Sequence, residues 1–391
     1  MKTNFGLTIS SLLLMAALSG CNTLPTSGPS QSAVLGVNDQ ENLPQVNVVE
    51  LDNQLVQSLY QTQQSQRFSG FVGTQMQSHY AGTANVGDVL DIAIWEAPPA
   101  VLFGSTFGET GQGSGHLTKL PAQMVNKKGT ITIPFAGDIA VKGKSPEAIQ
   151  KEIVRRLQGK ANQPQAMVQI INNNSANVTV IRQGNSVRMP LTANAERVLD
   201  AVAAIGGSPA DIQDITVQLT RGNQVKTVAF ETLIADPTQN IPLQANDVVS
   251  LLTTPYSFTG LGAVGSNQQV KFSTKGITLA EAIGKMGGLI DTRSDPRGVF
   301  VFRYIPFTQL SLPEQTTWRT NGYSEGMDVP TVYRANLLDP KAMFLLQRFP
   351  MQDKDIVYVS NAPLAEFGKF IRTIFSMTAP ITGTINSVNS L

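Results

Sequence analysis

An internal repeat constrains the fold of this chain more than any other feature of its sequence. Two segments each contain a helix-like stretch that ends at a glycine pair, Gly206-Gly207 or Gly287-Gly288, and in the first segment a strand-like stretch over residues 177–181 precedes it. Each segment closes with a similar strand entry, which starts near Pro242 in the first copy and near Pro350 in the second. This order predicts two small α+β units, each with a helix packed on one face of a sheet.

The two copies of the repeat differ in length. The strand entries lie farther apart in the sequence than the glycine pairs do, so the second copy contains an insertion. We place this insertion around residues 310–330, where proline, glycine and polar residues cluster. The helix of the second copy is expected to begin at Thr278, because Thr278 and Glu281 have the spacing of a capping box.

The segment before the repeat has a β pattern of its own. Apolar and polar residues alternate after Gly87-Asp88, which is typical of a half-buried strand. Ser145-Pro146-Glu147 predicts a helix start, with a capping hydroxyl, a proline at the first helical position and an acid in the first turn. The residues expected to face the core are Leu90, Ile92 and Ile94 on the strand and Ile149, Ile153 and Leu157 on the helix.

The N-terminus has the pattern of a lipoprotein signal peptide. A positive Lys2 precedes a short apolar run over residues 9–18, and Leu18-Ser19-Gly20 leads to Cys21, the only cysteine in the chain. The alternative is an ordinary secretory signal, but a lone thiol in an oxidising compartment would be a liability. We therefore expect lipidation at Cys21, and the following Asn22 favours sorting to the outer membrane.

The residues after the signal peptide are rich in Ser, Pro, Asn and Gln, and we predict a tether over residues 22–50. Leu51, Leu55, Val56 and Leu59 recur at helical spacing and predict a short amphipathic helix. No later stretch has 18 or more consecutive apolar residues, so a conventional transmembrane helix is not expected.

The C-terminal segment has an amphipathic pattern. A helix is expected to start at Pro363 and to end or kink at Pro380. Three arrangements are open: a membrane-spanning helix in a ring, a helix lying in the membrane interface, and a helix docked on the second repeat. The apolar face, which we expect to contact lipid, consists of Phe367, Phe370, Ile371, Ile374 and Phe375.

Glycine and tryptophan positions could suggest ligand binding. Residues 260–265 fit the dinucleotide pattern G-x-G-x-x-G, but that mechanism needs a helix directly after the glycines, and Ser266 to Val270 is a poor helix start. Trp95 could stack on a sugar, although we expect a tryptophan beside Pro98-Pro99 to lie in the core. We therefore expect no cofactor.

Catalytic and metal sites are not expected either. His79 and His116 have no cysteine partner and no cluster of acids nearby, which disfavours a metal site. Asp88 and Asp91 could form a glycosidase pair by residue type, but turn and surface roles are commoner for such positions. A formal net charge of +1 disfavours nucleic acid as a partner.

Several landmarks in this order resemble the outer-membrane polysaccharide export (OPX) lipoproteins, in particular the capsule exporters of the BexD/CtrA type. The resemblance covers nearly the whole mature chain. The landmarks are Cys21, the Gly87-Asp88-Val89-Leu90-Asp91 block with Trp95-Glu96-Ala97-Pro98-Pro99, residues 129–137, the two glycine-terminated repeats, Arg297-Gly298-Val299-Phe300-Val301-Phe302-Arg303 and Asn361-Ala362-Pro363-Leu364-Ala365-Glu366.

The resemblance implies an α+β, ring-forming fold. After a signal peptide (1–20) and a lipidated segment (21–79), it implies a polysaccharide-export domain (80–175), two soluble-ligand-binding β-grasp (SLBB) domains (177–255 and 256–362) and a C-terminal membrane helix with its tail (363–391).

The resemblance also implies a function. The chain is expected to be a non-enzymatic subunit of a homo-oligomeric, commonly octameric, outer-membrane channel for capsular polysaccharide. The implied partners are an inner-membrane ABC transporter and a co-polymerase-like adaptor. The alternative function is that of a periplasm-facing lipoprotein scaffold that binds polysaccharide or envelope partners without spanning the membrane.

Overall fold

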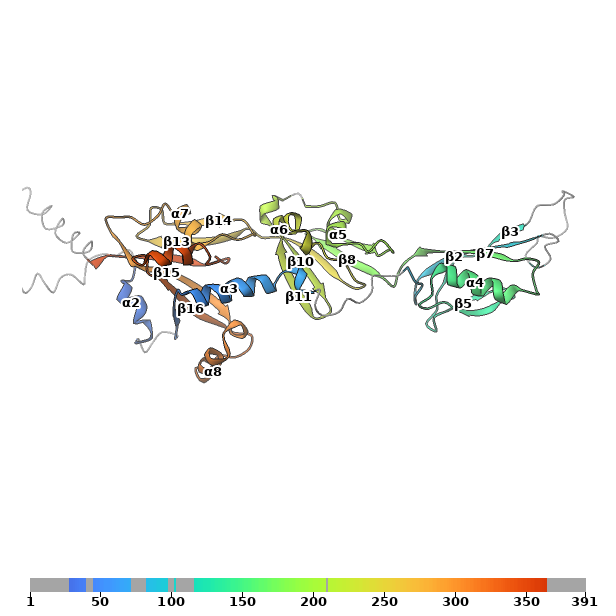
Figure 1. Cartoon of the computed structure of the whole chain (residues 1–391), viewed down its shortest axis with the longest axis horizontal. Coiled ribbons are helices and arrows are strands. Elements are labelled where there is room, and N and C mark those ends of the chain that lie inside the picture. The colour runs from blue at the N-terminus through green and yellow to red at the C-terminus, as the bar shows by residue number, and fades with distance from the viewer. Residues whose placement is uncertain are drawn as a thin grey trace, which may run out of the picture. The chain divides into compact units, whose positions relative to one another are not determined.

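The computed structural model describes residues 28–39, 45–71, 82–97, 102, 116–208 and 210–363. The chain divides into two compact units. Unit 1 combines Met1–Gln64 with Pro255–Leu391, and unit 2 is Ser65–Thr254. Figure 1 labels many of the elements of the two units.

Unit 2 contains a small sheet and a helix that precede the first copy of the repeat in the sequence. β2 forms the centre of this sheet and pairs with β3, β4 and β7, all antiparallel, and α4 packs against β7 (Figure 1). As predicted, Ser145 caps α4, and the apolar stripes of β2 and α4 are buried in one core. The elements are β2 (Val89–Glu96), β3 (His116–Lys119), β4 (Gln123–Met124), the hairpin β5 (Thr130–Ile133) and β6 (Gly137–Ala140), α4 (Pro146–Leu157) and β7 (Gln165–Asn172).

The first copy of the repeat completes unit 2. Its five-stranded sheet has the order β11-β10-β12-β8-β9, in which β8 and β12 are parallel and the other pairs are antiparallel. The elements are β8 (Asn177–Arg182), β9 (Asn185–Pro190), α5 (Val198–Ala204), η4 (Ile212–Asp214), β10 (Ile215–Arg221), β11 (Gln224–Ala229), α6 (Phe230–Ala235), η5 (Pro237–Gln239) and β12 (Val248–Thr253).

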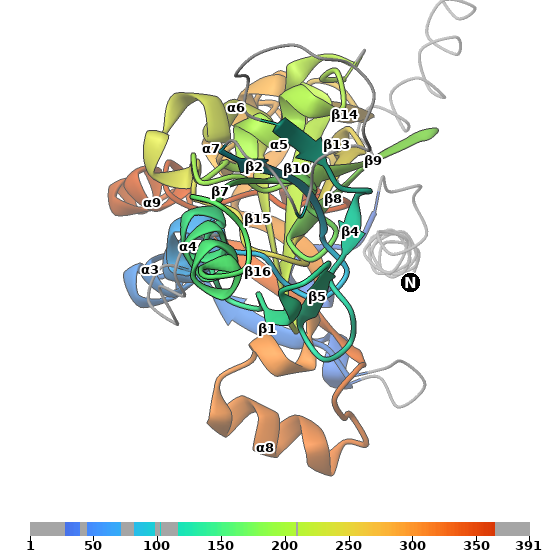
Figure 2. The same cartoon turned by 90° about the vertical axis from the view of Figure 1, so that its right-hand side faces the viewer.

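The second copy lies in unit 1 and has the same strand order, β16-β15-β17-β13-β14, with β13 and β17 parallel. The predicted insertion is present: η6 and α8 connect β15 to β16, whereas only Gly222 and Asn223 connect β10 to β11, and α8 stands away from the sheet (Figure 2). The elements are β13 (Tyr256–Gly262), β14 (Gln268–Phe272), α7 (Leu279–Lys285), β15 (Ser294–Pro306), η6 (Phe307–Gln309), α8 (Leu312–Thr320), β16 (Asp328–Ala335), α9 (Pro340–Leu346) and β17 (Ile356–Asn361).

The predicted tether is wrong for residues 28–39 and 45–50, which fold onto the second copy of the repeat. β1 (Asn47–Glu50) pairs in parallel with β16 and becomes the edge strand of a six-stranded sheet. Val34, in α2 (Gln31–Leu35), is buried against Phe300 and Val332; η2 (Val37–Asp39) follows. The polar composition hid this packing because few apolar residues anchor it. The amphipathic helix predicted next is present as α3 (Asn53–Ser65), with Val56 buried.

A buried ion pair connects β15 to the turn just before β17 in the second copy. The Arg303 side chain of β15 donates from Nε and Nη2 to the two carboxylate oxygens of Asp355, at 2.8 and 2.6 Å. The same Nη2 donates to the carbonyl of Pro350 at 2.9 Å, and the backbone N–H of Gln352 donates to Asp355 at 2.8 Å. Both charged side chains are almost completely buried, so the bond is a two-pronged, charge-assisted contact in a core.

The first copy repeats this arrangement. Arg221 of β10 donates from Nε and Nη2 to Asp247 at 3.0 and 2.7 Å, and from Nη2 to the carbonyl of Pro242 at 2.8 Å. The backbone N–H of Gln244 donates to the Asp247 carboxylate at 2.8 Å. Each copy therefore closes its sheet with an arginine of the third strand and an aspartate just before the last strand.

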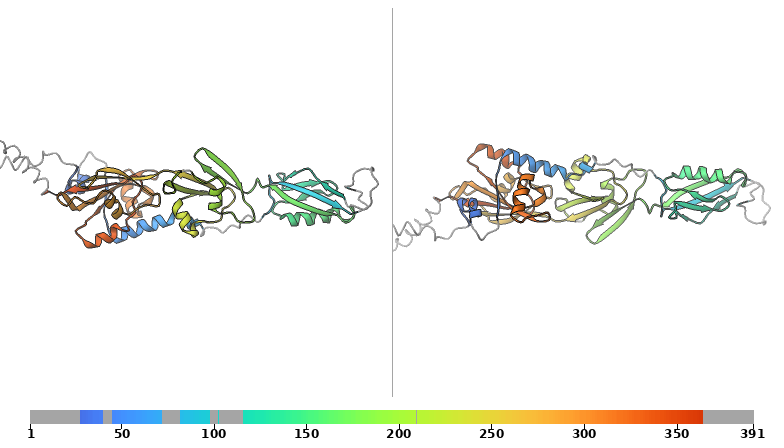
Figure 3. Two further views of the ribbon diagram at one scale, coloured as in Figure 1. Left: turned by 90° about the horizontal axis from the view of Figure 1, so that it is seen from above. Right: turned by 90° about the horizontal axis from the view of Figure 1, so that it is seen from below.

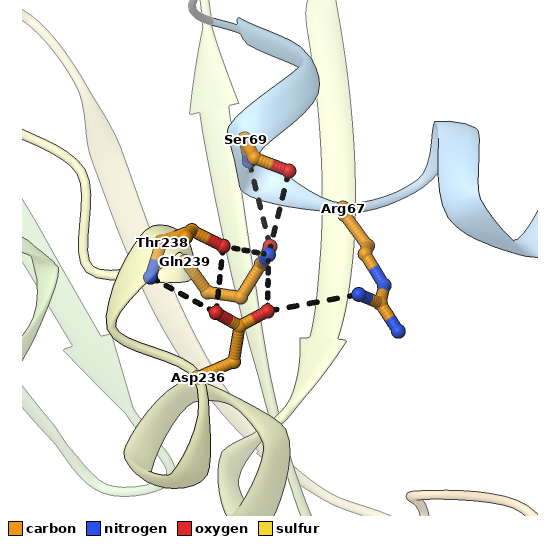
Figure 4. Close-up of polar contacts among 5 residues, drawn as sticks. All are labelled: Arg67, Ser69, Asp236, Thr238 and Gln239. Carbon is orange, nitrogen blue, oxygen red and sulfur yellow. Dashed lines mark hydrogen bonds and ion pairs between the residues drawn. The ribbon is translucent and has the colours of Figure 1, made fainter.

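A polar cluster fixes a short helix to the first copy. η3 (Phe68–Phe71) buries its two phenylalanines in the core of that copy. Figure 4 shows Asp236 accepting hydrogen bonds from Thr238 and Gln239, with Arg67 at 3.6 Å from the same carboxylate. These hydrogen bonds hold the pKa of Asp236 below its ordinary value, and the hydrogen bond from the side chain of Thr238 has the largest effect. Because the carboxylate is satisfied by its own loop, we assign this cluster a structural role.

The Asp355→Asn substitution should destabilise the second copy strongly. It leaves the buried charge of Arg303 without its counterion, which costs roughly 3–5 kcal/mol. Asp247→Asn should cost less, because the side chain of Arg221 is 18% exposed whereas that of Arg303 is 3% exposed. Urea unfolding measures both losses, with the exposed Asp291→Asn as the control. Equal and small losses in all three variants would contradict the importance of the buried pair.

The attachment of Phe68–Phe71 should depend on pH. A lowered pKa of Asp236 means that the folded state favours the carboxylate, so its contribution is complete above the ordinary value of 3.8 and is lost as the pH falls below it. Amide hydrogen exchange, corrected for the intrinsic pH dependence of exchange, should show the protection of Phe71 declining only below that value. In an Asp236→Asn variant this pH dependence should disappear.

Candidate functional site

The residues that the sequence analysis assigned to membrane attachment lie outside the described residues. These residues are Cys21, Phe367, Phe370, Ile371, Ile374 and Phe375. Within the part of the chain that the structure describes, no helix combines the length and the apolar character needed to cross a membrane.

The G-x-G-x-x-G motif is explained by close packing. Gly262 ends β13, has a positive φ of 93°, and a side chain there would collide with the carbonyl of Val359. Gly265 lies against the backbone of Gly287. The next element is the strand β14 and not a helix, as predicted, so the geometry that holds a pyrophosphate is missing from this motif.

The two aspartates considered as a catalytic pair are both engaged. Asp88 is fully buried and accepts three hydrogen bonds, from the backbone N–H of Asn85 and from the N–H and Oγ of Ser175, at 2.7 to 2.9 Å. Asp91 forms an ion pair with Lys119 at 2.8 Å. Asp88 therefore connects the turn before β2 to the chain that leaves β7.

The histidines do not assemble a site in the described part of the chain. His79 lies outside it, and His116 is the first residue of β3. The ranges that the structure describes hold no group of three or more His, Cys, Asp or Glu side chains that could bind a metal ion.

Trp95 is not a core residue, so the prediction that it lies in the core is wrong. Its side chain is 40% exposed on β2, beside its cross-strand neighbours Leu117 and Gln165. The physical reason is the two-residue period of a strand: Leu90, Ile92 and Ile94 face the core, so Trp95 must face outward. The alternation of apolar and polar residues in the sequence therefore predicts the outward orientation of Trp95.

The sheet face around Trp95 is open and mostly apolar. Leu117 and Met167 are also exposed, and together with Ala93 they line a shallow hollow of about 330 Å³ beside the indole ring. The face also carries the ion pair between Asp91 and Lys119, which has no net charge. An indole in such a setting can stack on the flat apolar face of a sugar or pack against another apolar surface.

A larger groove lies in unit 1. It has a volume of about 530 Å³ and is lined by α3 and by the segments that precede α7 and follow α9. Both views in Figure 3 show α3, in blue, beside α9, in orange-red. Gln57, Tyr60 and Gln61 of α3 line one side, and Lys275 and Arg348 line the other. The sequence pattern predicts the buried stripe of α3 but not this flank, because nothing in the periodicity indicates which loops face it.

Two family models match the chain. The model described as polysaccharide biosynthesis/export protein matches residues 77–171, which include β2 to β7. The model described as SLBB domain matches residues 258–359, which cover all of the second copy of the repeat except its first two and last two residues.

The chain is similar over its full length to capsule export proteins. It is 68% identical over 391 residues to the capsule polysaccharide export protein BexD of Haemophilus influenzae, covering 99% of each chain. It is 53% identical over 393 residues to the capsule polysaccharide export outer membrane protein CtrA of Neisseria meningitidis serogroup B, covering 100% of this chain and 99% of that one. The Vi polysaccharide export protein VexA/TviF of Salmonella typhi is 25% identical over 74% of this chain and 77% of its own. The chain therefore belongs to the outer-membrane polysaccharide export family.

Proposed function

We propose that this chain is a subunit of an outer-membrane channel that moves capsular polysaccharide from the periplasm to the cell surface. The observation that supports this most is the 68% identity to a capsule polysaccharide export protein over 99% of the chain. Identity of this extent covers the export domain, both copies of the repeat and the two termini together. The open face around Trp95 offers the polymer a surface for weak stacking, which suits passage better than tight binding.

The proposed membrane attachment has two parts. The first is a lipid on Cys21, which the signal-peptide pattern supports. The second is the amphipathic helix from Pro363, whose apolar face (Phe367, Phe370, Ile371, Ile374 and Phe375) would contact lipid while its polar face lines a water-filled lumen. A helix satisfies its own backbone hydrogen bonds, which is what the interior of a bilayer requires.

The length of this helix limits how it can span. Sixteen residues, from Pro363 to Thr378, cover roughly 24 Å at about 1.5 Å per residue, which is less than the ~30 Å of a hydrocarbon core. The helix must therefore continue beyond Pro380, or the membrane must be thinner around the ring. We propose the spanning arrangement and keep the interfacial and docked arrangements as its alternatives.

The proposed channel is passive and oligomeric. Close packing accounts for the glycine motif in the second copy of the repeat, so this motif offers no nucleotide site to drive transport. We therefore assign the energy and the direction of polymer transport to two partners, an inner-membrane ABC transporter and a co-polymerase-like adaptor. We propose a closed ring of identical subunits, with eight as the expected number. In this arrangement no residue of the chain performs chemistry on the polymer.

The second candidate function is a periplasm-facing scaffold that binds polysaccharide or envelope partners without spanning the membrane. The observation in its favour is that Asn47–Glu50 and Gln31–Leu35 fold back onto the second copy of the repeat, which shows that polar terminal segments of this chain can dock. A polysaccharide-modifying enzyme is disfavoured because Asp88 and Asp91 are both engaged in internal contacts.

Electron microscopy of the detergent-extracted, lipidated protein tests the channel directly. We expect closed rings with a continuous lumen and a narrow crown formed by residues after Pro363. Monomers whose C-terminal segment is folded back on the second copy would favour the scaffold.

Charges placed on the apolar face of the C-terminal helix should stop export. Phe370→Asp or Ile374→Asp would set a carboxylate against lipid, at a cost of about 2–4 kcal/mol per subunit. Surface capsule, measured with a capsule-binding antibody, should disappear while the purified chain keeps its unfolding transition.

The matched control is Thr373→Asp, which adds the same charge to the polar face of the same helix. Capsule should remain at the surface in this variant. Normal capsule in Phe370→Asp, or equal loss in Thr373→Asp, would count against a membrane-spanning role.

A further inference from the structure

The groove in unit 1 combines side chains that suit a polyhydroxylated ligand. Gln57 and Gln61 offer amide donors and acceptors, and Tyr60 offers a phenol ring that is 54% exposed. The floor beneath them is apolar, because Val56 is buried there beside Ile277 and Pro350. A volume of about 530 Å³ lies within the range of small-molecule sites in proteins.

The charges of the groove are not balanced. Lys275 and Arg348 are both exposed, and neither forms an ion pair with another residue in the described ranges. The acid that lines the groove is Glu281, and its carboxylate accepts hydrogen bonds from the N–H and Oγ1 of Thr278 at 2.7 and 3.1 Å. Glu281 is therefore held at the start of α7, and the groove presents two cations to a ligand.

Other classes of ligand fit this groove less well. A docked helix of another protein needs a row of apolar anchors, and the walls here are amides, a phenol and cations. Nucleic acid needs a basic surface over many phosphates, and the chain has a formal net charge of only +1. A sugar with a carboxylate matches each part: hydroxyls for the amides, a flat ring face for Tyr60 and an anion for the cations.

We propose that this groove binds a short segment of an acidic polysaccharide, with Lys275 and Arg348 holding its carboxylates and Tyr60 stacking on a sugar ring. This inference rests on the proposed function, since it names a place on the chain where the exported polymer is held. The groove belongs to the second copy of the repeat and to α3, and it is distinct from the face around Trp95. Its contacts lie at an exposed surface, so the binding is weak and salt-dependent.

Calorimetric titration of the full-length mature protein in detergent tests this proposal. The probes are a sialic acid hexamer, which carries carboxylates, and maltohexaose, which is neutral. We expect the acidic hexamer to bind more tightly than the neutral one and to weaken as salt is added. Inorganic phosphate is a third probe, and it should not displace the hexamer at matched concentration.

Three variants divide the groove by chemistry. The double variant Lys275→Gln/Arg348→Gln should lose about tenfold or more in affinity for the acidic hexamer, because it removes two charge-assisted hydrogen bonds. Tyr60→Ala should lose about fivefold for both oligosaccharides, and Tyr60→Phe should restore most of it because stacking needs only the ring. The control is Lys271→Gln/Lys285→Gln, which removes the same charge from exposed positions that do not line the groove.

The outcomes separate this proposal from the export function. A wild-type chain that binds neither oligosaccharide, or a control variant that loses as much affinity as the groove variant, overturns the assignment. Displacement by phosphate overturns it as well, because charge alone would then explain binding. None of these results affects the channel, which depends on ring formation and on surface capsule in the Phe370→Asp variant.

Discussion

The bridge between an arginine and an aspartate, made once in each copy of the repeat, is the interaction on which both sheets depend. It crosses from the third strand of each copy to the turn that opens the last strand, and these two strands are neighbours in both sheets. The two prongs of the guanidinium fix the distance and the angle between them. Asn246 directly precedes Asp247, and Lys354 directly precedes Asp355. Both residues have a positive φ, so the turn before the last strand has an uncommon backbone conformation in each copy.

The cost of this bridge explains its geometry. Removing a carboxylate and a guanidinium from water is expensive, and good geometry with additional hydrogen bonds offsets that cost. In both copies the arginine also reaches a proline carbonyl and the aspartate also accepts a backbone N–H. The duplicated sheet is therefore specified by a polar contact as well as by its apolar core.

Much of the fold could be predicted because it depends on short-range patterns. The repeat, the insertion carrying α8, the capped start of α4 and the capping box of α7 all follow from periodicity and from a few residues at fixed spacing.

The predictions that failed involve contacts between residues that are distant in the sequence. β1 pairs with β16 although its neighbours look like a tether, and the partners of the Arg303 bridge lie 52 residues apart. Trp95 differs from these cases, because the strand alternation places it outward whereas the general preference of tryptophan for the interior favours the core. The groove could not be predicted, since its two walls come from α3 and from loops far along the chain.

The parallel pairing of β1 with β16 has a mechanical consequence. β1 begins at Asn47 and β17 ends at Asn361, and both strands belong to one six-stranded sheet. The proposed lipid lies before the first of these strands and the proposed membrane helix lies after the second. A pull on the lipidated end would first load the contact of Val34 with Phe300 and Val332. Once α2 is released, a pull along β1 would load the rungs of the β1–β16 ladder in shear at the same time, and not peel them apart one by one. In this arrangement the six-stranded sheet would transmit tension between the two proposed attachments.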